Sequence, residues 1–265
     1  MSSVLLDVAD HVATITLNAP EARNAFVDTL REDMIRVCGE VNADPRVRVA
    51  IVTGAGSAFS AGGDLKAMQR KLQATPRVLP HVIEQSFIQG IHRLTRSLYQ
   101  LEVPSIAAIN GPAIGVGLDL ACMCDMRIAS QSAQFASSFV RIGLVPADGG
   151  AWLLPRAIGH AAAAEMMFTG RTIDAGQALR WGLVSEVLEP DALMARAREL
   201  AGQVAANANA TLRLTKKLMR QADDLSLDAV LPISAAAQAL AQYTPAHAEA
   251  VDAALARRRP DFGDM

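Results

Sequence analysis

The chain lacks several features that define other classes of protein. Its 25 basic residues are fewer than its 27 acidic ones, so no basic surplus supports a nucleic-acid groove or an anionic membrane surface. No charge-free apolar run reaches the roughly 18 residues of a membrane span. The opening "MSSVLLDVADHVATITLN" lacks the basic and long apolar regions of a signal peptide. These absences predict a soluble protein of the cytoplasm.

Cysteine is also scarce. The three residues, Cys38, Cys122 and Cys124, are too few and odd in number for a disulfide framework. Cys122, Cys124 and the following Asp125 could be imagined as metal ligands, but their neighbours are apolar and no histidine cluster is near. We therefore expect buried thiols and no metal.

With 265 residues and 51% hydrophobic composition, the chain can form one large domain or a domain with an appendage. Alternation in "SVLLDVADHVATITL" predicts a hairpin. Helical spacing predicts helices over residues 27–42 and 83–101, and "VRVAIVTGAG" predicts a buried strand over residues 47–56. Residues 72–82 have weak periodicity and are predicted to form a mobile loop.

A strand followed by a glycine loop and a helix occurs twice, which is typical of crossover α/β units. From about residue 190 the chain is almost entirely helical and rich in Ala, Leu and Arg. We therefore divide it into a core with the site, residues 1–190, and a C-terminal helical region, residues 191–265. The apolar faces of that region either pack on their own domain or form a subunit interface, and the second explanation is favoured.

The two glycine loops are "FSAGGDL", residues 59–65, and "GPAIGVGLDL", residues 111–120. Each opens a helix, where backbone N–H groups are free and the helix dipole is positive. Glycine lets a carbonyl approach the backbone, so two converging loops would form an oxyanion hole. A nucleotide-phosphate site is disfavoured, because Gly115-x-Gly117 lacks a third glycine and no Gly-Lys-Ser/Thr motif occurs.

The chain resembles the crotonase (enoyl-CoA hydratase/isomerase) superfamily over nearly its whole length. The resemblance rests on "PEARNAF", "GAGSAFSAGGDLKAM", "VPSIAAINGPAIGVGLDLACMCDMRIAS", "AQFASSFVRIGLVPADGGAWLLPRAIG", "FTGRTIDAGQALRWGLVSEV" and "RRRPDF". The sequence around "FVRIGLVP" is similar to the corresponding segment of isomerase-type members, such as those of phenylacetate breakdown. The resemblance implies an α/β crotonase-like spiral of ββα units with a C-terminal α-helical trimerisation region, acting as a homotrimer or a hexamer (dimer of trimers). It implies an acyl-CoA substrate and no cofactor beyond the coenzyme A of that substrate.

The resemblance also assigns residues to the site. The thioester oxygen would be held by the N–H groups of Gly63 and Val116, the latter in a triplet that is commonly all glycine. Phe139 and Trp152 would line an acyl or aromatic pocket, although core packing explains them equally well. Backbone contacts to coenzyme A are expected at Ala25, Ala61, Asp64 and Leu65; candidates for its phosphates are Lys66, Arg23 and Lys216, each of which could equally be a solvated surface charge.

Family hydratases use two glutamates, and here the chain departs from them. The first position holds Asp119 and the second holds Phe139, which cannot transfer a proton. A remaining base can still take a proton from an enoyl thioester and return it elsewhere, which shifts the double bond. Asp119 is therefore a candidate catalytic residue, the alternative being a helix cap or a buried, hydrogen-bonded carboxylate.

Asp148 is the other candidate. In isomerase-type relatives an acidic residue directly follows the proline of this loop, whereas here Ala147 follows Pro146 and Asp148 comes one place later. Its alternative is a turn or N-cap residue before two glycines. The sequence thus predicts an enoyl-CoA isomerase acting through Asp119 and Asp148. The alternatives are an enoyl-CoA hydratase, an acyl-CoA hydrolase and a non-catalytic acyl-CoA binder.

Overall fold

The computed structural model describes residues 2–73 and 75–263. Its main sheet has the strand order β1-β2-β3-β4-β6-β9. The predicted hairpin is confirmed, since β1 (Val4–Ala9) pairs antiparallel with β2 (Val12–Leu17). All later neighbours in this sheet pair in parallel. The later strands are β3 (Val49–Gly54), β4 (Ser105–Ile109), β6 (Met126–Ser130) and β9 (Glu186–Leu188).

Helices cover both faces of this sheet, so its central strands are apolar throughout. On β3, Ala50 and Val52 face the larger core, which includes α1 (Asp28–Ala43). Val49 and Ile51 face the other way, against α9 (Leu193–Ala205). The buried residues of α9 are Leu193, Ala197, Ala201 and Ala205. Because α9 packs on the sheet, it joins the core although it falls within residues 191–265.

A second, smaller sheet carries the site. It consists of β5 (Ala113–Ile114), β7 (Gln134–Ala136) and β8 (Thr172–Asp174), with β5 and β7 parallel. Directly after β5 comes α5 (Val116–Met123), every residue of which is buried. The short helix η2 (Phe139–Ile142) follows β7. Further helices of this half are α6 (Gly150–Ile158), α7 (His160–Thr169) and α8 (Ala175–Arg180).

The single helix predicted over residues 83–101 is wrong. Two helices, α3 (Pro80–Gln89) and α4 (Ile91–Tyr99), meet at Gly90, whose φ and ψ of −108° and −98° are not helical. A Cβ at Gly90 would lie 2.9 Å from the guanidinium of Arg31 on α1, so close packing against α1 accompanies the break. The loop predicted over residues 72–82 is shorter, because α2 (Leu65–Gln73) extends into it; residue 74 lies outside the described part.

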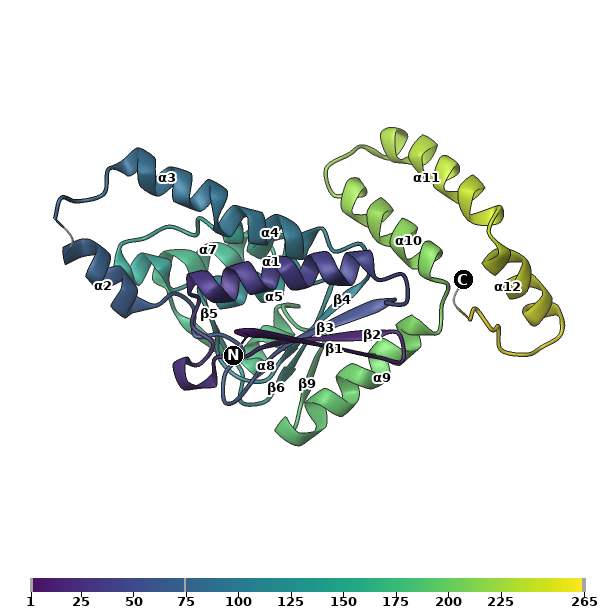
Figure 1. Ribbon diagram of the computed structural model, residues 1–265, viewed down its shortest axis with the longest axis horizontal. Helices are drawn as coiled ribbons and strands as arrows, with labels where there is room; N and C mark the ends of the chain where they lie inside the picture. Colours follow the sequence, from purple (N-terminus) through teal and green to yellow (C-terminus); the bar gives the residue numbers. More distant parts are fainter. Residues whose placement is uncertain (1, 74, 264–265) are drawn as a thin grey trace.

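The C-terminal helices project from the core. Figure 1 shows α10 (Asn209–Ala222), α11 (Leu227–Gln242) and α12 (Pro245–Leu255) reaching away from the main sheet. No residue of α11 is buried, although the helix is rich in Leu and Ala. Among the described residues, no helix combines the length and apolar character needed to cross a membrane.

Candidate active site

The two glycine loops lie against each other. The N–H of Ser60 donates to the carbonyl of Pro112 at 3.0 Å, and that of Ile114 donates to the carbonyl of Ser60 at 3.0 Å. Gly62 has a φ of +87°, and a Cβ there would lie 2.5 Å from the carbonyl oxygen of Ile114. Glycine is therefore required at Gly62 both for its backbone conformation and for the close approach of the loops.

Both proposed oxyanion donors are available for a ligand. Within residues 2–73 and 75–263, no acceptor takes a hydrogen bond from the N–H of Gly63 or of Val116. Val116 is the first residue of α5, where the helix dipole places partial positive charge. A Cβ at Gly117 would lie 2.5 Å from the carbonyl oxygen of Ser60, so α5 begins in contact with the first loop. This arrangement can stabilise negative charge on an oxygen atom.

Asp119 and Asp148 meet behind this loop. Asp119 lies on α5 and is fully buried, while Asp148 precedes α6 and is 4% exposed. The two carboxyl groups are close enough for each to influence the pKa of the other. No other described residue offers a donor to either oxygen of Asp119. Two ionised carboxylates buried near each other repel, so the pair is more stable with one proton than with none.

The surroundings raise the pKa of both acids. Burial raises the pKa of Asp119 well above its ordinary value, and the nearby charge of Asp148 adds to the effect. Burial also raises the pKa of Asp148, whereas the hydrogen bond with Asp119, its own backbone N–H and the charge of His92 act in the opposite direction. The pKa values of both acids are thus raised, and Asp119, with the stronger rise, is the one that holds a proton more readily. The pair can thus offer one acid and one base.

Asp148 is not a helix cap. The N-cap position of α6 is Gly149, with no side-chain cap hydrogen bond. The loop instead contacts α4: the hydroxyl of Thr95 can donate to the carbonyl of Asp148 at 2.8 Å or to that of Ile91 at 3.0 Å, and Nε2 of His92 lies 2.8 Å from the carbonyl of Ala147. Since a carbonyl only accepts, Nε2 must carry a proton, as it does in one neutral tautomer and in the cation. Neither Thr95 nor His92 stands out in the sequence, where both fall within the helix predicted over residues 83–101.

Gly150 closes the space above Asp119. A Cβ at Gly150 would lie 2.4 Å from each carboxylate oxygen of Asp119. The first turn of α6 can therefore cover the carboxylate only because this residue has no side chain. The sequence signal for this contact is the glycine pair that follows Asp148, although the pair alone does not say which residue it approaches.

Phe139 stands next to the oxyanion loop. Its ring lies 3.6 Å from where a Cβ of Gly115 would be, and Gly115 directly precedes Val116. The position that holds the second glutamate in hydratases therefore presents an aromatic ring here. Ser137 is also close by in sequence: its hydroxyl is buried and has no partner among the described residues. An unpaired buried hydroxyl costs about 1–3 kcal/mol.

The residues predicted to contact coenzyme A surround the first loop. The N–H of Ala61 donates to the carbonyl of Arg23 at 2.9 Å, and that of Phe26 to Gly62 at 2.7 Å, which brings the segment with Ala25 beside this loop. Asp64 accepts hydrogen bonds from the N–H groups of Lys66 and Ala67 at the start of α2. Leu65 and Lys66 are exposed. Their contact with coenzyme A stays a prediction.

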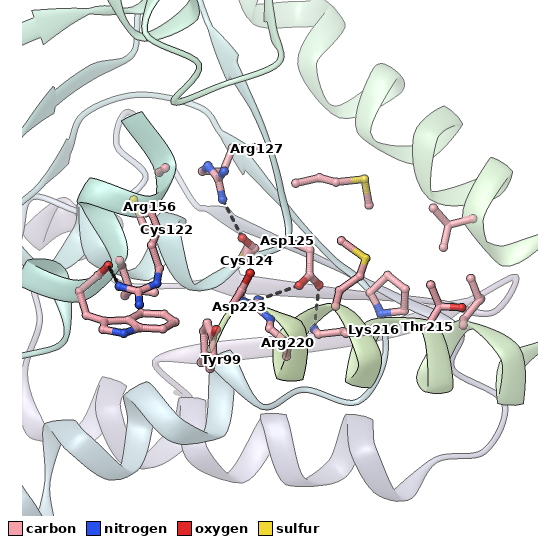
Figure 2. Close-up of a pocket in the computed structure, with 18 of the residues that line it drawn as sticks. Tyr99, Cys122, Cys124, Asp125, Arg127, Arg156, Thr215, Lys216, Arg220 and Asp223 are labelled. Carbon is pink, nitrogen blue, oxygen red and sulfur yellow. Dashed lines mark hydrogen bonds and ion pairs between the residues drawn. The ribbon is translucent and has the colours of Figure 1, made fainter. Parts of the chain in front are cut away.

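A separate cavity of about 610 Å³ lies at the other end of α5, between the core and α10 (Figure 2). Trp152 lines it, with the guanidinium of Arg156 stacked 3.7 Å from its ring and Tyr99 packed edge-on. The structure therefore places Trp152 in this second cavity, and its role in an acyl pocket stays a prediction. The cavity contains Cys122 but neither Asp119 nor Asp148.

Lys216 also lines this cavity and has a structural role. Its ammonium is 2.7 Å from the carboxylate of Asp125, which also pairs with Arg220 at 2.7 Å (Figure 2). Lys216 donates to the carbonyl of Val103 as well and is only 6% exposed, so it has no free charge for a phosphate. Burial is the main cause of its lowered pKa. This ion-pair cluster attaches α10 to the core.

The cysteines are buried thiols, as predicted. All three lie in the interior without a disulfide. Burial raises the pKa of Cys122 and Cys124 to about 12. A thiol with such a pKa stays protonated near neutral pH and is a poor metal ligand.

Comparison with known proteins agrees with this geometry. The family model for enoyl-CoA hydratase/isomerase matches residues 7–265. The chain is 35% identical to the 1,2-epoxyphenylacetyl-CoA isomerase of Escherichia coli K12, over 99% of this chain and 98% of that protein. It is also 35% identical to the (E)-benzylidenesuccinyl-CoA hydratase of Thauera aromatica, over 98% of each.

Solved structures show the same fold. An enoyl-CoA hydratase from Bacillus anthracis superposes with a TM-score of 0.92 at 31% identity, covering 99% of this chain and 100% of that one. A putative enoyl-CoA hydratase/isomerase from Mycobacterium abscessus gives a TM-score of 0.91 at 34% identity, covering 98% and 99%. With a paired-carboxyl site beside two free N–H groups, the chain belongs to the enoyl-CoA hydratase/isomerase family, the crotonases, and is an enzyme of that type.

Proposed function

We propose that this enzyme shifts a double bond in an enoyl-CoA thioester. The observation that carries the proposal is the Asp119–Asp148 carboxyl pair, together with Phe139 at the second hydratase position. Similarity does not choose between the reactions, because an isomerase and hydratases are all 35% identical to the chain. Isomerisation is favoured because Asp119 and Asp148 can act as acid and base, whereas Phe139 stands at the second hydratase position and cannot transfer a proton.

In the proposed reaction the thioester oxygen accepts hydrogen bonds from the N–H groups of Gly63 and Val116. Ionised Asp148 takes a proton from the α-carbon of a 3-enoyl thioester, and the electron pair moves to form a dienolate on the thioester oxygen. Asp119 then gives its proton to the γ-carbon as the electrons return. The product is the 2-enoyl thioester, and the pair has exchanged the positions of its proton and charge.

The test is incubation of the purified enzyme with a 3-enoyl-CoA in D₂O. Isomerisation yields the conjugated 2-enoyl-CoA, which absorbs more strongly in the ultraviolet, without a gain of water in the mass spectrum. Addition of water to 2-enoyl-CoA above background would instead favour the hydratase. Release of free coenzyme A, followed with a thiol reagent, would favour a hydrolase. Binding without any of these reactions would leave an acyl-CoA binder.

We also propose that the enzyme is a homotrimer or a dimer of trimers. The support is the apolar surface of α11, where Leu227 and Leu231 are 71% and 55% exposed one turn apart. A lone chain gains little from holding such a helix in water. Light scattering should give three or six times the chain mass of 28.1 kDa. Leu231→Glu should reduce this mass to that of the monomer, whereas Gln238→Glu, also on α11, should not.

A further inference from the structure

The hydroxyl of Ser137 has no use within the protein itself. Ser137 is 1% exposed, and no described residue lies within hydrogen-bonding distance of its Oγ. The other buried side-chain atoms in this condition, across the described part of the chain, belong to Asp119 and Asp148. Buried hydroxyl groups are nearly always hydrogen-bonded, so one that is not requires an explanation. Alanine would fill almost the same volume without a polar atom to satisfy.

Its position in the fold points to the bound acyl group. Ser137 directly follows β7, whose last residue, Ala136, accepts a hydrogen bond from the N–H of Gly115 at 2.8 Å. The parallel register of β5 and β7 pairs Ile114 with Ala136, so Ser137 lies beside Gly115. The next residue along the second loop is Val116, a donor to the thioester oxygen. The segment that contains Ser137 therefore borders the place where the acyl chain leaves the thioester.

Ser137 does not form a hydrogen bond with Asp119 or Asp148. If its hydroxyl were bonded to either acid, its Oγ would have a partner, and it has none. The two residues that follow it also border the second loop: Oγ of Ser138 and the ring of Phe139 lie 4.0 Å and 3.6 Å from where a Cβ of Gly115 would be. The two residues after Ser137 thus bring an aromatic ring and a second hydroxyl to the second loop.

We propose that Ser137 selects acyl groups that carry an oxygen substituent, by hydrogen bonding to a hydroxyl, ether or carbonyl oxygen of the acyl chain. The inference rests on the proposed function and deepens it, because it names the substrate class of the same site. A pure hydrocarbon chain leaves the hydroxyl buried without a partner, whereas an oxygenated chain supplies one. Sites of this kind discriminate strongly, because the poorer ligand leaves a polar group unpaired.

Calorimetric binding of matched thioester pairs tests this selection. Each pair consists of an ester with a hydroxyl and one without it: butyryl-CoA with its 3-hydroxy and 4-hydroxy forms, and phenylacetyl-CoA with its 2-hydroxy form. The wild type should bind at least one hydroxylated ester about tenfold more tightly than its partner, equivalent to about 1.4 kcal/mol. Ser137→Ala should bring this ratio close to one, and Ser137→Thr, which keeps the hydroxyl, should retain most of it.

Ser97→Ala is the control, since this hydroxyl bonds within α4, to the carbonyl of Arg93; it should keep the ratio. A wild-type ratio near one for every pair, or an unchanged ratio in Ser137→Ala, would overturn the proposal. Binding of the esters by an enzyme that turns over no enoyl-CoA would remove the isomerase activity but leave this selection testable. A wild type that binds none of them would overturn both.

Thermal stability gives a second readout. Without ligand, Ser137→Ala should melt about 2 °C higher than the wild type, because an unpaired buried donor has been removed. A lower melting temperature would show that the hydroxyl has a partner in the free protein, which contradicts the proposal. A purely structural serine would lose stability on this change and leave the ratio of affinities unaffected.

Discussion

Two buried acids dominate the site at the scale of single residues. Asp119 and Asp148 share a space with few other polar groups, and burial raises the pKa of each. An arrangement of this kind lowers stability and is retained where its chemistry is needed. Both consequences, for turnover and for stability, can be measured by replacing one carboxyl with an amide of the same shape.

Turnover should depend on both acids. Asp119→Asn and Asp148→Asn are each expected to lower kcat for double-bond migration by about 10²–10⁴-fold, since each removes one of the two proton-transfer groups. Affinity for a saturated acyl-CoA should change little. The wild-type pH profile should have two limbs, because activity needs one proton on the pair, and each variant should lose one limb. Full activity in either variant would remove that residue from the mechanism.

Stability should respond to pH through the same pair. A carboxyl whose pKa is raised by folding holds its proton in the folded protein after the unfolded chain has lost it near pH 4. The stabilisation is therefore complete below about pH 4 and is lost as the pH rises through the folded pKa. Asp119→Asn should raise the free energy of unfolding, relative to wild type, near pH 8 but not near pH 4. Urea titrations at the two pH values check this, and an equal effect at both would contradict it.

At the scale of elements, α4 holds the loop that contains Asp148. Thr95→Val removes the hydrogen bond to the carbonyl of Asp148, and we expect kcat to fall about tenfold because the base is misplaced. KM should stay nearly constant. Ser97→Ala is the control: this hydroxyl of α4 bonds only within its helix, to the carbonyl of Arg93. Equal kcat values for Thr95→Val and the wild type would show that α4 does not set the position of Asp148.

Elements whose formation depends on a few neighbouring residues could be predicted from the sequence. The hairpin, the strand over residues 49–54 and both glycine loops follow from alternation, buried runs and glycine position. The break at Gly90 did not follow, because a single glycine is tolerated in helices and the break lies against Arg31 of another helix. The orientation of the loop that contains Asp148 could not be predicted either. It depends on contacts from His92 and Thr95 to the loop backbone, and both residues lie more than fifty positions earlier in the chain.

At the scale of the whole molecule, one buried ion-pair cluster joins the C-terminal helices to the core. Lys216→Ala should lower the free energy of unfolding by about 3 kcal/mol, because Asp125 loses one of its two cations in a buried setting. Lys217→Ala, at the exposed neighbouring position, should change it by less than about 0.5 kcal/mol. Urea unfolding measures both, and similar values for the two variants would show that the cluster contributes little.

The contact between Gly150 and Asp119 constrains how this enzyme could have diverged from its hydratase relatives, or be returned to their chemistry. A Cβ at Gly150 would lie 2.4 Å from each carboxylate oxygen of Asp119, so the carboxylate packs against the first turn of α6, and we expect a longer acid there to require a shift of this turn. The shortened acid and the close helix therefore depend on each other, and neither can change alone. Asp119→Glu combined with Phe139→Glu should thus fail to create a hydratase, which a hydration assay on 2-enoyl-CoA can show. An exchange of the acid at position 119 should therefore require a movement of α6 as well as a change of side chain.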